Sequence, residues 1–180
     1  MRAPGTRPIL ILELAGIPFI VFLGSALHFT FEWSGENPLV GVFSAVNESV
    51  WEHLKLSFWP ALLYAIMEHR YLRGRTKRFL PAKAVGLYLM PLSIVSFFYL
   101  YRAFLEESLA LDISIFILAV VIGQLASYKL MVRKGSSGIS TGVSLLALAL
   151  LAVLFVVFTF SPPRLPIFED PTTGGYGIGA

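Results

Sequence analysis

The sequence predicts an all-α integral membrane protein, a bundle of about five transmembrane helices with a short re-entrant or interfacial segment. Two observations lead to this fold class. Of the 180 residues, 56% are hydrophobic and only 14% are charged, whereas soluble domains carry about 25% charged residues. Apolar stretches of about twenty residues, each long enough to cross the hydrocarbon core as a helix, recur along nearly the whole chain. They lack the alternating pattern of barrel strands, so we expect helices.

The first transmembrane helix is expected at residues 8–31, where Arg7 precedes a long apolar run. A cleaved signal peptide begins in a similar way, but its apolar core is shorter and would not contain Glu13. Further helices are expected at about residues 49–67, 79–101, 109–131 and 139–160. Together these spans form one transmembrane domain over residues 1–160.

Two segments outside the spans also have an expected place. Residues 38–46 form an apolar run that is too short to cross a bilayer, so they form the re-entrant or interfacial piece. Residues 161–180 are rich in Pro and Gly yet keep several large apolar side chains, which disordered tails rarely do. We therefore expect an extracytoplasmic tail that packs on the outer face and brings Glu169 and Asp170 toward the polar residues described below.

The distribution of basic residues predicts the orientation. With a cytoplasmic N-terminus, the inner side receives eleven of the fourteen Lys and Arg residues, and only Lys55, Arg102 and Arg164 fall outside. The inner residues are Arg2, Arg7, Arg70, Arg73, Arg75, Lys77, Arg78, Lys83, Lys129, Arg133 and Lys134. This indicates a multi-pass protein of the cell membrane with an extracytoplasmic C-terminus. It also explains the net charge of +3 better than a nucleic-acid partner does. The segment from Arg70 to Arg78 is expected to contact anionic lipid headgroups of the bilayer.

The start of the second span is unusually polar. Asn47 and Glu48 suit the start of a helix, because an amide oxygen can cap free N–H groups and a carboxylate is favoured at the positive end of the helix dipole. Glu52, His53 and Lys55 lie further in, where an ionised side chain costs energy unless it faces water or a partner. The apolar residues share another arc, which we expect to meet lipid: Val50, Leu54, Phe58, Ala61, Leu62 and Ala65. Pro60 removes one helical hydrogen bond and frees a carbonyl near Leu56.

A metal site is one interpretation of these polar residues. His28 and Glu32 share a face of the first helix near the same boundary of the membrane. With Glu52 and His53 they would supply nitrogen and oxygen ligands for a divalent metal such as zinc. Glu48 would then be the candidate catalytic base of a metal-dependent hydrolase. A distance under about 6 Å between the His28 and His53 imidazoles would suit a shared metal, given metal–nitrogen bonds of about 2.0–2.1 Å.

Other interpretations remain open. The same residues could act in acid–base catalysis without a metal. They could also form a structural polar network with Asn47, in which Glu52 pairs with Lys55 and His28 with Glu32. Glu13 belongs to that polar set and needs a partner, for which Arg70 and His69 are candidates. A network of this kind suits a non-enzymatic membrane component, either a small-solute or ion carrier or a scaffold. The absence of cysteine excludes disulfides, thiolate metal sites and cysteine nucleophiles.

Three motifs carry a resemblance to a known family. They are His28-x-x-x-Glu32-Trp33, the block from Asn47 to Lys55 that reads NESVWEHLK, and a tail with Pro162-Pro163, Phe168-Glu169-Asp170-Pro171 and Tyr176-Gly177. The chain resembles, over nearly its whole length, an uncharacterised family of small multi-pass membrane proteins from prokaryotes. The resemblance implies that the first span is retained and that the tail is part of the fold. It implies no catalytic role for any residue.

Overall fold

The computed structural model describes residues 6–133, 135 and 138–179, and over these residues the protein is helical. The elements are α1 (Thr6–Trp33), α2 (Pro38–Gly41), α3 (Val50–Leu72), α4 (Phe79–Arg102), α5 (Leu109–Val132), α6 (Thr141–Phe160) and the 3₁₀ turn η1 (Pro166–Phe168). Extended pairing in the described residues is limited to an isolated bridge between Glu169 and Tyr176. The all-α prediction is confirmed. Arg2 and Lys134, which contributed to the charge distribution, lie outside the described residues.

Four of the helices are long and apolar enough to cross a membrane, namely α1, α4, α5 and α6. The fifth long helix, α3, has 23 residues and would also reach across, but it carries Glu52, Lys55 and Glu68 along its length. The chain is therefore a helical membrane protein. Each predicted span coincides with one of these five helices, and the largest difference is at α3, which runs to Leu72 instead of ending near residue 67.

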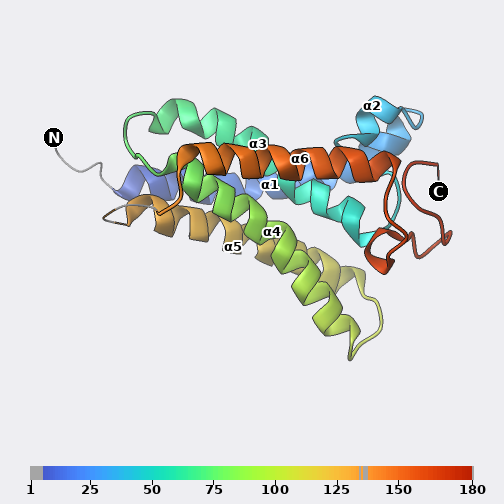
Figure 1. The fold of residues 1–180 in the computed structure, drawn as a ribbon. Coiled ribbons are helices and arrows are strands. Elements are labelled where there is room, and N and C mark those ends of the chain that lie inside the picture. Colours follow the sequence, from blue (N-terminus) through green and yellow to red (C-terminus); the bar gives the residue numbers. More distant parts are fainter. Residues whose placement is uncertain (1–5, 134, 136–137, 180) are drawn as a thin grey trace.

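The helices run back and forth, so that their connections gather at two ends (Figure 1). The N-terminus of α1, the α3–α4 connection and the α5–α6 connection lie at one end, which carries Arg73, Arg75 and Lys77 and is called the basic end below. Residues 34–49 with α2, the α4–α5 connection and the tail lie at the other. This second end carries Glu36, Glu48 and most other acidic residues, and is called the acidic end.

The core forms where α3 meets its neighbours. Helix α1 packs against α3 and α5, and α4 packs against α3, α5 and α6. Phe58 of α3 is completely buried among Ile20 of α1, Met90 of α4 and Phe155 of α6. Because these side chains come from four helices, they form an apolar layer across the middle of the bundle.

The expected lipid-facing arc of α3 is wrong. Leu54, Phe58 and Ala61 are at most 3% exposed and form part of the core, and Ala65 is also buried. Glu52 and Lys55 on the polar side are buried as well, because the loop after α2 and helix α6 cover them. The exposed apolar side chains in the second half of α3 include Leu63, Ile66 and Met67, and the exposed polar residues His69 and Arg70 follow them. Other parts of the protein therefore cover both the apolar arc of α3 and the polar side around Lys55.

Glycine allows α1 to approach α3 closely at the position of Pro60. The proline has no N–H, so the carbonyl of Leu56 lacks its usual helical partner, as the sequence suggests. A Cβ atom on Gly24 of α1 would lie only 2.5 Å from that carbonyl oxygen. Only a residue without a side chain lets the two backbones meet here, and the contact fixes α1 against the end of α3 that carries His53.

The short segment after α1 packs back onto that helix. Its four-residue helix α2 has a well-exposed Leu39, but Ser44 further on is completely buried. The Ser44 hydroxyl accepts a hydrogen bond of 3.0 Å from the backbone N–H of Phe31 and donates one to the carbonyl of Leu27. The segment is therefore fastened to the end of α1 and covers one side of α3.

The tail folds against the acidic end instead of extending away. The Phe168 ring packs on Trp51 of α3 at a centroid distance of 4.8 Å, and Ile178 N–H donates to the carbonyl of Thr159 at 2.8 Å. The Asn47 side-chain amide donates to the carbonyl of Gly177 at 3.0 Å. These contacts join the tail to α3, to α6 and to the segment that precedes α3.

Candidate metal centre

Two histidines meet at the acidic end. His28 lies near the end of α1 and His53 in the first turn of α3, and the antiparallel packing of the two helices brings these turns together (Figure 1). The two Nε2 atoms are 3.2 Å apart, and the ring centroids are 5.0 Å apart. The separation is within the 6 Å that the sequence analysis sets for a shared metal.

Glu48 completes the group. Its Oε2 atom lies 3.5 Å from Nε2 of His53 and 3.8 Å from Nε2 of His28. All three potential ligand atoms lie within 4.8 Å of one another. The carboxylate distances are longer than the roughly 2.7–3.2 Å of a direct hydrogen bond. They are closer to the edge of a tetrahedron around zinc, which is about 3.3–3.6 Å for metal–ligand bonds of about 2.0–2.2 Å.

The other ring nitrogen of His53 is already engaged. Nδ1 lies 2.8 Å from the carbonyl oxygen of Ser49, one turn earlier at the cap of α3. A carbonyl can only accept a hydrogen bond, so Nδ1 carries the proton and the Nε2 lone pair of neutral His53 points toward His28 and Glu48. A backbone carbonyl that fixes the tautomer in this way is a common second partner of metal-binding histidines.

The group is open to water. The side chains of His28, His53 and Glu48 are 30%, 33% and 49% exposed. On the first helix the His28 ring also stacks on Phe29 at a centroid distance of 4.9 Å. Three protein ligands and an accessible remaining position are typical of catalytic zinc sites, whereas structural sites are closed by four protein ligands.

A further carboxylate lies nearby. Asp112, in the first turn of α5, accepts a hydrogen bond of 2.6 Å from the hydroxyl of Tyr101 and is close enough to His53 to act on it through its charge. From the sequence, Asp112 could reach a cavity of the bundle or serve only as interhelical contact, because nothing local connects α5 with α3.

Residues 8–178 match the profile of a family of unknown function, DUF6512. The chain belongs to the DUF6512 family. The expected membership of a family without an assigned activity is thereby confirmed, and the prokaryotic origin stays a prediction. No curated protein and no solved structure matches the chain.

In this member of DUF6512, Glu52 lies apart from the histidines. Its Oε2 atom is 2.5 Å from Nζ of Lys55 and accepts a hydrogen bond of 3.0 Å from the N–H of Val46. Consecutive positions on a helix are about 100° apart, so Glu52 and His53 face different neighbours. Glu52 is therefore a partner of Lys55 and not a ligand beside the histidines.

Lys55 is completely buried, and each of its three N–H donors has an acceptor. Besides Glu52, its ammonium group donates to the carbonyl of Gly41 and to the hydroxyl of Thr159, both at 2.8 Å. The Glu52–Lys55 pair thus links the segment after α1, α3 and α6. This part of the expected polar network is present in the fold.

The remaining predicted site residues of the DUF6512 chain, Glu32 and Asn47, do not lie where the sequence suggests. Glu32 is exposed and does not belong to the group of neighbouring ligand atoms found among the described residues. Asn47 does not cap α3. The cap is Ser49, whose hydroxyl accepts from Glu52 N–H at 3.4 Å, while Asn47 Oδ1 accepts from Ser49 N–H at 3.0 Å. The cap therefore lies two residues after Asn47, whose side chain contacts Ser49 N–H and the tail instead.

Glu13 belongs to a separate site toward the basic end. Its carboxylate lies 2.8 Å from Nζ of Lys83 on α4, so the expected partners Arg70 and His69 are wrong. The completely buried Ile20 lies between Glu13 and His28 on α1 and packs in the same cluster as Phe58 of α3. A hydrophobic layer therefore separates the two polar sites of this DUF6512 protein.

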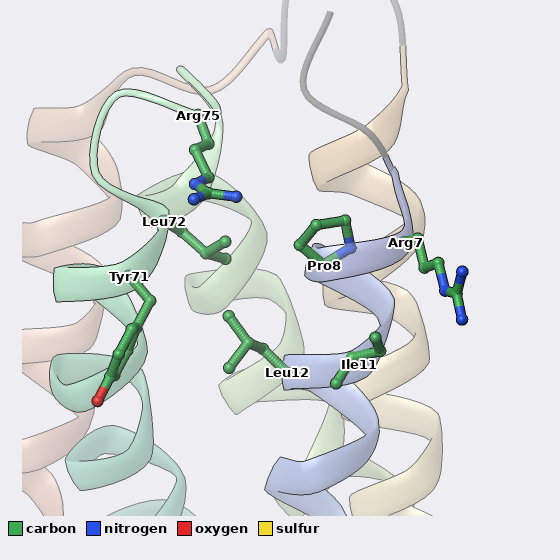
Figure 2. A pocket seen from close by; sticks show the side chains of 7 residues that line it. All are labelled: Arg7, Pro8, Ile11, Leu12, Tyr71, Leu72 and Arg75. Atoms are coloured by element: carbon green, nitrogen blue, oxygen red, sulfur yellow. The ribbon is translucent and has the colours of Figure 1, made fainter.

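A pocket of about 350 Å³ opens at the basic end between α1 and the end of α3 (Figure 2). Its lining is mainly apolar and includes no carboxylate or histidine. The lining residues are Arg7, Pro8, Ile11, Leu12, Tyr71, Leu72 and Arg75. It has none of the ligands of the His28–Glu48–His53 group and lies at the opposite end of the bundle.

Proposed function

We propose that this protein binds a divalent transition metal, zinc in the first place, through Nε2 of His28, Nε2 of His53 and a carboxylate oxygen of Glu48. One observation carries the proposal. The two Nε2 atoms lie 3.2 Å apart while Nδ1 of His53 is held 2.8 Å from the Ser49 carbonyl. A cation between the two lone pairs and the carboxylate satisfies all three groups at once.

The kind of ligand favours zinc over calcium or magnesium. Imidazole nitrogen suits zinc, copper, iron and nickel, whereas calcium and magnesium prefer oxygen ligands in larger numbers. Two histidines and one glutamate are also a known ligand set of catalytic zinc. We therefore assign Glu48 as a third ligand instead of the catalytic base that the sequence suggests.

The chemistry that fits this site is metal-dependent hydrolysis at the membrane surface. Zinc lowers the pKa of a bound water to about 7 and so supplies a nucleophile near neutral pH. The exposure of the three side chains leaves room for that water and for an ester or amide of a substrate.

The orientation and the lipid contacts belong to the same proposal. The excess of Lys and Arg at the basic end supports a cytoplasmic position for that end in the cell membrane. The metal centre and the tail then lie on the extracytoplasmic side. Exposed arginines from Arg70 to Arg75 supply contacts for anionic lipid headgroups.

A non-enzymatic membrane component is the second candidate, and the Glu52–Lys55 pair favours it. This pair is buried, links three segments and needs no ligand. If the three ligand atoms of the other group likewise served only to hold α1 against α3, the protein would be a scaffold. A carrier would in addition need a hydrated path through the layer formed by Ile20 and Phe58.

Zinc binding separates the candidates. We expect the purified protein, prepared without chelators and dialysed against zinc, to retain a single zinc ion per chain. His28→Ala, His53→Ala and Glu48→Gln should each weaken zinc affinity by at least about 100-fold, since even outer-shell changes cost about 10–100-fold. Glu32→Gln is the matched control, because it removes a carboxylate one turn from His28 that lies outside the group.

Two outcomes would contradict the proposal at different levels. Wild-type protein that takes up no more zinc than His53→Ala would refute the metal site. Protein that binds zinc through these residues but shows no zinc-dependent turnover of ester or amide substrates in vesicles would keep the site and refute the hydrolase. The scaffold then remains, with the metal in a structural role.

A further inference from the structure

A second polar cluster lies inside the bundle toward the basic end. It consists of Glu13 from α1, Glu68 from α3 and Lys83 from α4, whose side chains are at most 1% exposed. Nζ of Lys83 is 2.8 Å from a carboxylate oxygen of Glu13 and also contacts a carboxylate oxygen of Glu68. We call these three residues the Glu–Lys–Glu triad. Its members come from three helices, so the triad depends on the assembled bundle.

The charges of the triad do not balance. Two carboxylates and one ammonium group leave one negative charge, and an uncompensated charge in a buried apolar site is strongly unfavourable. Among the described residues, Lys83 is the one cation paired with either carboxylate. The other groups that face the triad are neutral. They are Tyr64 of α3, whose hydroxyl donates to the Leu12 carbonyl at 2.5 Å, and Ser127 and Gln124 of α5.

Two oxygen atoms of the triad also lack a partner. Oε2 of Glu13 and Oε1 of Glu68 are buried and accept no hydrogen bond from any described residue. Buried carboxylate oxygens normally have a donor, because an unsatisfied group keeps its full desolvation penalty. A proton on one carboxyl group would remove the surplus charge and turn an unsatisfied acceptor into a donor.

We propose that the Glu–Lys–Glu triad is a binding site for one exchangeable proton, and that Glu68 carries it. Glu13 has the more complete set of donors, because its Oε1 accepts from Lys83 at 2.8 Å and from Ser127 at 2.7 Å. Glu68 has only its contact with Lys83. The ammonium group already occupies the space between the carboxylates, so a metal cation would have to displace it. When the site is loaded, the Glu68 carboxylate takes a proton from a hydronium ion to give the neutral acid and water, and the reverse step returns the proton to water.

The pocket at the basic end gives the side from which the proton exchanges. Leu12 and Leu72 line that pocket, and their side chains lie between α1 and α3 (Figure 2). Glu13 directly follows Leu12, and Glu68 lies one turn before Leu72 on α3. Glu68 therefore shares a face of α3 with Leu72, which places the triad on the pocket side of the layer with Ile20 and Phe58 that separates it from the metal centre. The proton site faces the basic end and is independent of the proposed zinc site.

Infrared spectroscopy of the purified full-length protein in lipid nanodiscs tests this site. A protonated carboxyl group has a C=O stretching band that a carboxylate lacks, and the band shifts to lower frequency in D₂O if the proton exchanges. We expect wild-type protein at neutral pH to show such a band. Glu68→Gln should lose it, and Glu13→Gln should also lose it, because the remaining Glu68–Lys83 pair is neutral without a proton. Lys83→Met should instead increase the band, since both carboxyl groups would then be protonated.

The control variant is Glu52→Gln, which removes a buried carboxylate outside the triad and should leave the triad's band in place. A wild-type spectrum without the band, or a band that persists in both Glu68→Gln and Glu13→Gln, would overturn the proposal. If one glutamate variant fails to fold, the other still tests the assignment, and a wild-type spectrum without the band overturns the proposal by itself. A band that disappears on adding sodium or potassium would assign the site to a metal cation, and one that never shifts in D₂O would show that no proton exchanges.

Discussion

Lys55 and Lys83 are both completely buried, yet their surroundings differ in one respect. Lys55 has one carboxylate, one carbonyl and one hydroxyl as acceptors, so its pair with Glu52 is neutral and its donors are all used. Lys83 has two carboxylates and leaves oxygens without donors. A buried ion pair that is complete in charge and hydrogen bonds serves the fold. One with surplus charge needs something from outside, and here we assign a proton.

The strongest test of this difference is to neutralise one glutamate at each lysine. Glu52→Gln should destabilise the protein by about 3–5 kcal/mol, because it leaves the Lys55 ammonium group buried without its counter-charge. Glu68→Gln should change stability by less than about 1 kcal/mol, since Gln resembles the protonated acid and Lys83 keeps Glu13. Thermal unfolding in detergent, followed by circular dichroism, measures both. Equal losses in the two variants would show that the two lysines are in equivalent surroundings.

Removing both partners at Lys55 should recover most of the loss. The double variant Glu52→Gln, Lys55→Met buries no charge, and replacing a whole buried pair is often neutral, whereas breaking it costs about 3–5 kcal/mol. A double-mutant cycle with the single variants gives the coupling energy. If the double variant is no more stable than Glu52→Gln alone, the contacts to Gly41 and Thr159 hold the segments together more than the ion pair does.

The sequence predicts the positions of the helices well, but it predicts less well which surroundings each helix face contacts. Long apolar runs place five helices because the bilayer fixes their length, and each is found. The prediction that the apolar arc of α3 meets lipid is wrong. Hydropathy separates apolar from polar faces but does not show whether lipid or protein covers an apolar face. In α3, Phe58 meets other helices and Ile66 is exposed, although both are apolar.

The two polar sites show the same limit. His28 and His53 were proposed together from their similar depth in the membrane, and their helices do bring them together. The spacing to His28 suggests Glu32 and the polar start of the second span suggests Glu52, but neither lies with the two histidines. The triad was missed because Lys83 also fits the pattern of a topology-setting charge and its partner Glu13 lies on another helix, far away in sequence. A lysine five residues into an apolar helix was the available signal.

A third test changes the packing beside the triad without touching its charges. A Cβ atom on Gly16 would lie 2.0 Å from Nε2 of Gln124 and 2.6 Å from the Tyr64 ring. Gly16→Ala should therefore displace both side chains that surround Glu13 and cost about 1–3 kcal/mol, as overpacking does. Thermal unfolding gives the loss, and the infrared band of Glu68 should shift. Zinc affinity at the acidic end should stay unchanged, and a parallel loss there would show that the two sites are coupled.

The smallest expected effect concerns Asp170 in the tail, a buried carboxylate that has neutral donors and no lysine. Its oxygens accept from the N–H of Thr172 at 2.9 Å and from the hydroxyls of Thr172 and Thr173 at 2.7 and 2.9 Å. Burial favours the neutral acid, but these hydrogen bonds outweigh it and lower the pKa of Asp170 below its ordinary value. A lowered pKa stabilises the folded tail above the unfolded-state pKa of about 3.9, and this contribution is lost as the pH falls through the lower, folded value. Asp170→Asn should thus cost about 1–2 kcal/mol at neutral pH and progressively less in acid. Proteolysis of the tail at several pH values measures this, and a difference between the two proteins that does not shrink in acid would show that the carboxylate's charge is not what holds the tail.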